Sequence, residues 1–319
     1  WLLTWRHAGW GLRMAGKWIA AALGWVFLAA GVPAPAQSDT GFPPSVASSG
    51  LTQKQWEAAL ARSEHLASEL GVTRDAVRNL AISYLGAERR LSFGEAVQQL
   101  EAALRALAAY RADVARSAPL LPSALLAQRA NALALVDQGQ LREARSAYAA
   151  LIIQARASAE VPTRAIAELL AESAGLASID GDFVTSASLY GAAADLAPDT
   201  DIAARWWWRN SGANQLAKAG ERTGREADLR AAVREFETQV VPLTSLEARP
   251  LDWASTQNDL AQPLRMLGEM GDDVAAERAI SALEGARQVH TRDGYPNEWA
   301  MITINLGIAR SVLAQRSGD

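Results

Sequence analysis

The residues of this chain best suited to recognising another molecule are the consecutive side chains of Trp206, Trp207, Trp208 and Arg209. Successive residues of a helix lie about 100° apart, so three adjacent indoles span roughly 200° of its surface. One buried stripe cannot cover all three rings. Trp and Arg are favoured at the energetic centres of protein interfaces. We therefore expect Trp206 and Trp208 to pack between helices, and Trp207 either to anchor a partner or to join the core.

The sequence offers few side chains for catalysis or metal binding. The chain contains three histidines, His7, His65 and His290, and no cysteine. None of these histidines has a second histidine or a carboxylate at the spacing of a zinc-binding helix. Phosphate loops, dinucleotide fingerprints and nucleophile elbows have no match either. These patterns predict a non-catalytic chain without a metal or a small-molecule cofactor.

Two acidic glycine-containing segments only superficially resemble calcium loops. Asp180-Gly-Asp182 and Gly271-Asp-Asp273 lack the later ligands and the terminal glutamate of such loops. We expect both to be turns in which an aspartate caps the next helix, and the glycine turn before Arg225 to be another inter-helix connection. The net charge of −4 and the isoelectric point near 5.6 also argue against a nucleic-acid partner.

The helices that would position Trp207 belong to a repeated pattern. Pro250-Leu-Asp-Trp253-Ala254 is matched 46 residues later by Pro296-Asn-Glu-Trp299-Ala300, and Leu260 is matched by Leu306 at the same offset. A fixed period of this length is typical of stacked repeats, whose units cannot bury their apolar faces alone. Half of the residues are hydrophobic, with alanine and leucine dominant, which favours an all-α fold.

Two earlier units carry a pattern of small, large, turn and aromatic positions. Its members are Ala132, Leu135, Gly139, Ala144 and Tyr148, and then Ala174, Ala177, Gly181, Tyr190 and Pro198. Over roughly residues 120–319 the chain resembles the tetratricopeptide repeat (TPR) family, and its later units look like a long-period bacterial variant. The resemblance implies an α-solenoid of helical hairpins that binds other proteins. Its offsets of 42 to 48 residues exceed the usual ~34, so longer helices or longer loops are expected.

The same alignment selects a candidate partner-binding face. Placing Gly212-Ala213 on the family pattern puts residues of two successive first helices on the inner side: Trp207, Asn210, Asn214, Asn258, Gln262 and Arg265. Side-chain amides and guanidinium groups can satisfy a peptide backbone. The hypothesis is a concave groove that holds an extended or helical peptide.

Residues 51–118 are expected to form a separate helical region before the repeats, which occupy residues 119–319. Thr52 is the predicted cap of a helix from Gln53 to about Leu70, Thr73 caps a second, and a third covers Glu95 to about Ala115. The segment 66–79 resembles a DNA-binding helix-turn-helix. Because its second helix offers few basic groups and then becomes apolar, a structural corner is favoured.

The N-terminal 36 residues are typical of an export signal. Lys17, the apolar run 18–31 and Ala34-Pro-Ala36 supply its three parts, although residues 1–13 could instead be translated upstream sequence. Residues 37–50 are expected to be a flexible linker. The protein is therefore expected to be periplasmic or secreted, or membrane-anchored if the leader is not cleaved.

Three interpretations of function stay open. The first is a scaffold or adaptor for a protein or peptide. The second is the regulatory segment of a larger protein, since the final helix either caps the repeats or was cut short. That final helix carries an apolar stripe formed by Ile302, Leu306, Ala309 and Leu313. The third is a cytoplasmic helix-turn-helix regulator.

Overall fold

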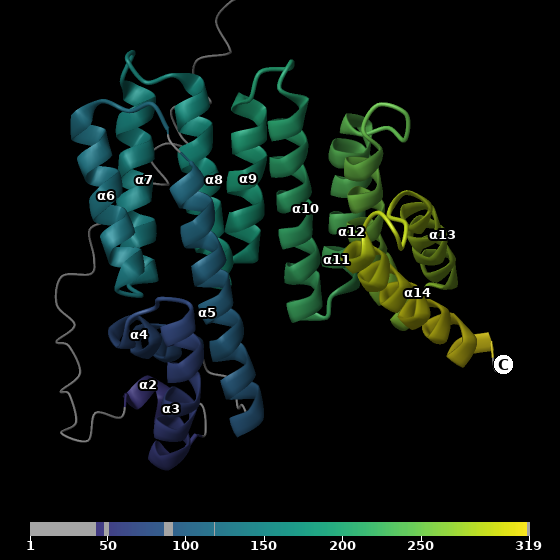
Figure 1. The fold of residues 1–319 in the computed structure, drawn as a ribbon, viewed down its shortest axis with the longest axis horizontal. Helices are drawn as coiled ribbons and strands as arrows, with labels where there is room; N and C mark the ends of the chain where they lie inside the picture. Colours follow the sequence, from purple (N-terminus) through teal and green to yellow (C-terminus); the bar gives the residue numbers. More distant parts are fainter. Residues whose placement is uncertain (1–42, 48–50, 86–91, 118, 318–319) are drawn as a thin grey trace, which may run out of the picture. The chain divides into compact units, whose positions relative to one another are not determined.

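The computed structural model describes residues 43–47, 51–85, 92–117 and 119–317 (Figure 1). Over these ranges the chain forms thirteen α-helices and no β-strand, which confirms the all-α fold class. None of these helices is long and apolar enough to span a membrane. The predicted export signal over residues 1–36 and His7 lie outside the described residues. Within the predicted linker, α2 (Pro44–Ala47) is a short helix, and its Val46 is fully buried.

The N-terminal region consists of three further helices that pack on one another: α3 (Gln53–Glu69), α4 (Arg74–Leu85) and α5 (Phe93–Arg116). The predicted cap at Thr52 is confirmed, because its hydroxyl accepts a hydrogen bond from the backbone N–H of Gln55, and the backbone N–H of Thr52 donates to Oε1 of Gln55. Ser92 caps α5 in the same way. The three predicted helices are thus present with nearly the expected bounds.

The corner between α3 and α4 is a packing element. Thr73 caps α4, as expected, and its hydroxyl also donates to the carbonyl of Asp137 at 3.4 Å. The Asn79 amide donates to the Gln138 carbonyl at 2.7 Å. The start of α4 therefore rests on the turn between two repeat helices.

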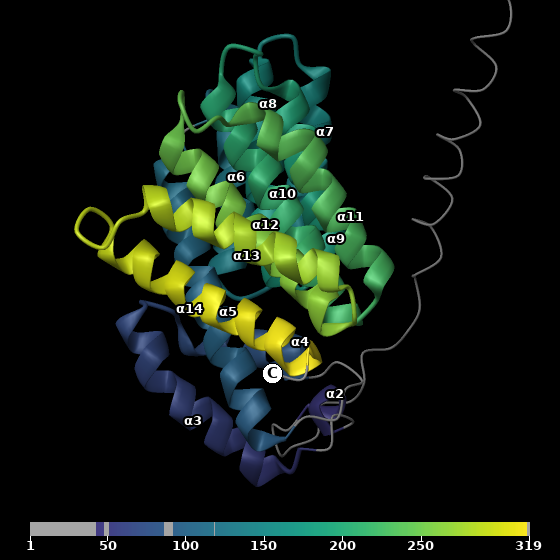
Figure 2. The ribbon, with the colours of Figure 1, turned by 90° about the vertical axis from the view of Figure 1, so that its right-hand side faces the viewer.

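In the region predicted to hold the repeats, the described residues 119–317 form nine helices, each packed chiefly on its neighbours in sequence (Figures 1 and 2). They are α6 (Ser123–Asp137), α7 (Leu141–Ala157), α8 (Thr163–Ile179), α9 (Phe183–Leu196), α10 (Ile202–Thr223), α11 (Glu226–Glu235), α12 (Pro250–Glu269), α13 (Asp273–Val289) and α14 (Pro296–Ser317). In addition, α12 contacts both α10 and α14. The two proline-led helices, α12 and α14, begin 46 residues apart, as the repeat predicts.

The acidic glycine segments are turns, as predicted. Gly181 and Gly271 adopt positive φ values of 75° and 116°, which a residue without Cβ accepts at the end of a helix. Asp182 and Asp272 then cap α9 and α13 by accepting hydrogen bonds from backbone amides.

The same turns also receive arginines from preceding helices. Arg145 on α7 contacts Asp180 at 2.5 Å and Asp182 at 2.6 Å, and Arg230 on α11 contacts Asp272 at 2.8 Å. Desolvation raises the pKa of Asp182, but the hydrogen bonds from Arg145 and Thr185 outweigh it and lower that pKa below its ordinary value. Each such aspartate therefore both begins a helix and joins successive layers.

The long period comes from both expected causes, longer helices and a longer connection. The first helices are long, with 22 residues in α10 and 20 in α12. The connection between α11 and α12 is also extended, because α11 continues as a π-helical turn, Phe236–Val240, and a 3₁₀ turn, Val241–Leu243. Phe236 and Val240 are fully buried, so this irregular segment fills the core beneath α12.

Substitution of Gly268 tests how tightly α12 and α13 pack, and substitution of Gly307 on α14 is its control. A Cβ at Gly268 would lie 2.8 Å from the Ala276 Cβ, whereas one at Gly307 would meet nothing within 4 Å. We expect Gly268→Ala to lower the free energy of unfolding by about 1–3 kcal/mol through overpacking. Gly307→Ala should raise it by about 0.5–1 kcal/mol through helix propensity. Urea denaturation measures both, and a stabilised Gly268→Ala variant would contradict close packing.

Candidate functional site

Only one of the three consecutive tryptophans is exposed. Trp208 is 6% exposed and lies under the Arg164 guanidinium, 5.2 Å from its ring centroid. Trp206 is partly buried and donates through Nε1 to the Thr256 hydroxyl at 2.9 Å. Trp207 is 55% exposed. The Trp207 ring contacts that of Trp206, with centroids 6.2 Å apart, but more than half of the residue stays exposed. The angular argument from the sequence is confirmed, because the three indoles are not all buried.

Trp207 and Trp208 line a cavity of about 630 Å³ between α5, α8, α9 and α10. We call it the aromatic groove and define it by six of its residues: Tyr110, Arg164, Tyr190, Trp207, Trp208 and Lys218. Its volume is in the range of ligand-binding clefts. Indoles and phenols provide apolar surface with a polar edge, so such a groove suits a partner with both kinds of group.

The cations of the groove differ in whether the chain already pairs them. Arg164 contacts Glu168 at 2.8 Å and also binds Asp201. Lys218 forms no ion pair within the described part of the chain, although it is exposed at the groove. Desolvation lowers the pKa of its amine, and the charges of Glu221 and Asp259 act in the opposite direction. Lys218 is therefore the groove cation left for a partner, and sequence reasoning missed it.

The predicted amide donors are largely used inside the protein. Asn210, only 7% exposed, and Asn214 each donate to Oδ2 of Asp259 at 2.8 Å. Asn258 donates to Asp259 Oδ1 at 3.4 Å and accepts from Asn305 at 3.1 Å. These groups form a polar ladder that joins α10, α12 and α14. The side-chain amide nitrogens of these three residues therefore bind acceptors within the chain, and partner binding through them stays a prediction.

The remaining predicted residues lie on the same side of α12. Gln262 and Arg265 are both partly buried, and Arg265 pairs with Glu269 one turn later. Of the six predicted partner-binding residues, Trp207 alone has a large exposed apolar surface in the aromatic groove. The structure thus brings the six onto two adjacent helices, but it gives most of them packing roles.

An exposed apolar stripe on α14 was also missed. Met301, Ile304 and Ile308 are 48%, 64% and 43% exposed. Each lies 46 residues after Ser255, Asn258 or Gln262, so the repeat offset could have placed them on the same face. Sequence reasoning concentrated instead on the neighbouring stripe. Three of its members, Ile302, Leu306 and Ala309, are buried as core residues.

A buried polar cluster lies at the inner end of the groove. Arg129 on α6 binds both oxygens of Glu172 on α8, through Nε at 2.9 Å and Nη2 at 2.6 Å. Tyr148 on α7 donates to Glu172 at 2.8 Å, and Tyr110 on α5 donates to Tyr148 at 3.4 Å. Burial raises the pKa of both tyrosines well above the ordinary value. The cluster therefore joins four helices.

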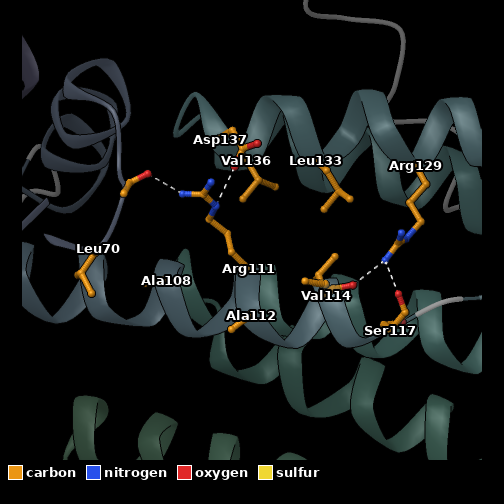
Figure 3. Close-up of a pocket in the computed structure, with 12 residues that line it drawn as sticks. Leu70, Ala108, Arg111, Ala112, Val114, Ser117, Arg129, Leu133, Val136 and Asp137 are labelled. Atoms are coloured by element: carbon orange, nitrogen blue, oxygen red, sulfur yellow. Dashed lines mark hydrogen bonds and ion pairs between the residues drawn. The ribbon is translucent and has the colours of Figure 1, made fainter. Parts of the chain in front are cut away.

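A second cavity, of about 580 Å³, lies between α5 and α6 (Figure 3). Arg111 and Arg129 stand on either side of it (Figure 3). Arg111 donates to the Gly71 carbonyl at 2.9 Å and contacts Asp137 at 3.0 Å. Arg129 donates to the carbonyls of Val114 and Ser117. Both guanidinium groups are already bound by the chain, so this cavity is an incompletely filled gap beneath α5.

No metal-binding group of three His, Cys, Asp or Glu residues occurs within the described ranges. Comparisons of the chain with protein-family models, with curated proteins and with solved structures gave no match. The residues of the aromatic groove are therefore the basis for assigning a function.

Removing the buried charge of Glu172 tests the polar cluster. Its side chain is 4% exposed and that of Arg129 is 13% exposed. We expect Glu172→Gln to lower the free energy of unfolding by about 3–5 kcal/mol, because Arg129 loses its counter-ion. The matched change Glu168→Gln affects the more exposed pair with Arg164 and should cost less than about 1 kcal/mol. Equal effects in chemical denaturation would contradict this difference.

The buried phenols predict a loss of stability at alkaline pH. Burial, together with the charge of Asp113, raises the pKa of Tyr190 from 10.0 to about 12. Because the folded state favours the protonated phenol, this stabilisation is complete below about pH 10 and is lost as the pH rises towards 12. Melting temperatures between pH 8 and 12 should show this fall, and Tyr190→Phe should reduce it. A pH-independent difference between the two proteins would contradict the assignment.

Proposed function

We propose that this protein is a non-catalytic scaffold or adaptor that binds a protein or peptide at the aromatic groove. The observation that carries the proposal is Trp207, which is 55% exposed while both neighbouring indoles pack. Covering this much apolar indole surface with a partner stabilises the complex, because the surface is removed from water. Lys218 lines the same groove without an ion-pair partner among the described residues, and it supplies a charge for orientation.

The proposal includes a finer description of the fold, an α-solenoid of TPR-like hairpins. Three observations support it: the 46-residue offset between α12 and α14, the close packing of α12 on α13, and the contacts of α12 with α10 and α14. In that arrangement the first helix of each pair faces the inner side. Trp207 and Lys218, eleven residues apart, then lie on one stripe of α10.

Binding is preferred to catalysis because of what the groove contains. Its lining includes indoles, phenols and charged side chains, and Arg164 and Glu172 are already ion-paired within the chain. Such a lining suits the recognition of a protein surface. The acidic net charge of −4 favours a protein partner over nucleic acid. Export to the periplasm or beyond remains part of the proposal and rests on residues 1–36.

The proposal is tested by affinity capture from the exported fraction with three baits: the unchanged chain, Trp207→Ala and Ile153→Ala. Ile153 is a matched control because it is 69% exposed on α7 and does not line the aromatic groove. A partner should be captured by the unchanged chain and by Ile153→Ala. Trp207→Ala should bind it roughly tenfold or more weakly, as expected for an interface anchor.

Circular dichroism of Trp207→Ala distinguishes binding from folding. The helical signal and the melting temperature should match those of the unchanged chain. If the variant unfolds, Trp207 is a core residue. If it folds and captures the same partner with equal affinity, the aromatic groove is not the binding site.

A further inference from the structure

A helix of the chain itself already lies against the inner side of α8. Ala171, Gly175 and Ser178 form a stripe of small residues on α8, and all three line the aromatic groove. The Tyr110 ring of α5 rests on this stripe: a Cβ at Gly175 would lie 2.8 Å from its Cδ2 atom. Helix α5 contacts α8 (Figure 1) and lines the same groove as Trp207.

An open cleft lies on each side of α5. The cleft of about 630 Å³ lies towards α10, and the cleft of about 580 Å³ lies towards α6, as Figure 3 shows for the second. A helix with an open cleft on either side makes fewer contacts than a close-packed core helix, so fewer contacts break when it moves.

Several polar contacts join α3–α5 to the helices that follow. Thr73 and Asn79 donate to carbonyls in the α6–α7 turn, Arg111 pairs with Asp137, and Arg129 donates to the Val114 carbonyl.

We propose that α5 is an internal occupant of the partner-binding face, a helix that covers α8 in the free protein and is displaced when a helical partner binds. This inference rests on the proposed function and adds its regulation. Displacement of α5 would uncover Gly175, Tyr148 and Glu172, and so extend the face from Trp207 across α8. A site that already holds a helix of its own chain selects a helix, and not an extended peptide, as its partner.

Native-state hydrogen exchange on the full chain tests whether α5 opens by itself. Amides of α5 should exchange through an opening of lower free energy than the amides of α8 and α12. If α5 exchanges only together with α8, in one global unfolding event, α5 is part of the core and the proposal is overturned.

Two alanine variants sharpen this test. Gly175→Ala places a Cβ against the Tyr110 ring and should speed the exchange of α5 by roughly tenfold or more, because overpacking destabilises the closed state. Exchange in α12 and α13 should not change. Gly307→Ala, which meets no neighbouring atom within 4 Å, should leave α5 unaffected. Equal acceleration of α5 and α8 in Gly175→Ala would overturn the proposal.

Spin labels give a second readout, because the chain has no cysteine of its own. Arg105→Cys on α5 and Ile153→Cys on α7 replace exposed residues and provide one labelled pair. Electron–electron distance measurements should show one main separation, with a second, longer one populated in the Gly175→Ala background. An unchanged single separation in that background would overturn the proposal.

These measurements need no partner, so they are independent of the test of Trp207. If partner capture depends on Trp207 but α5 opens only on global unfolding, the internal-occupant proposal alone is overturned. If α5 opens separately but partner capture is unaffected by Trp207→Ala, the proposed binding site is overturned.

Discussion

The buried ion pair between Arg129 and Glu172 is the constraint on which the arrangement of the groove depends. A buried carboxylate must be matched by a cation and by hydrogen bonds, or burial costs several kcal/mol. Here Glu172 receives Arg129 from α6 and the Tyr148 hydroxyl from α7. Arg129 in turn binds backbone carbonyls at the end of α5. Satisfying one charge therefore sets the relative positions of four helices.

That constraint explains why the groove lies where it does. The carbonyls of Val114 and Ser117 hold the end of α5 close to α6, and the Tyr110 ring then settles on Gly175 of α8. The space left between α5 and α10 is the aromatic groove, with Trp207 in its wall. The same buried cluster that stabilises the fold thus shapes the surface proposed to bind a partner, and it lies beneath the helix proposed to regulate that surface.

The sequence predicted much of the helical framework and part of the site. Thr52 as a cap, Asp182 and Asp272 as turn caps, and the 46-residue offset all depend on residues close in sequence or on a repeated spacing. Trp207 was also identified locally, from the angle between adjacent indoles. Lys218 was missed because its place in the aromatic groove depends on how α10 packs against α5 and α8, and no local pattern encodes that.

The sequence by itself determined where helices begin and end, because caps, turns and apolar periodicity act over a few residues. It also determined that the three adjacent indoles could not all be buried. Only the tertiary structure decided that Asn210 would be bound by Asp259, 49 residues away, and Arg129 by Glu172, 43 residues away. The physical reason is that hydrogen-bond partners on different helices are chosen by packing, which local spacing does not encode.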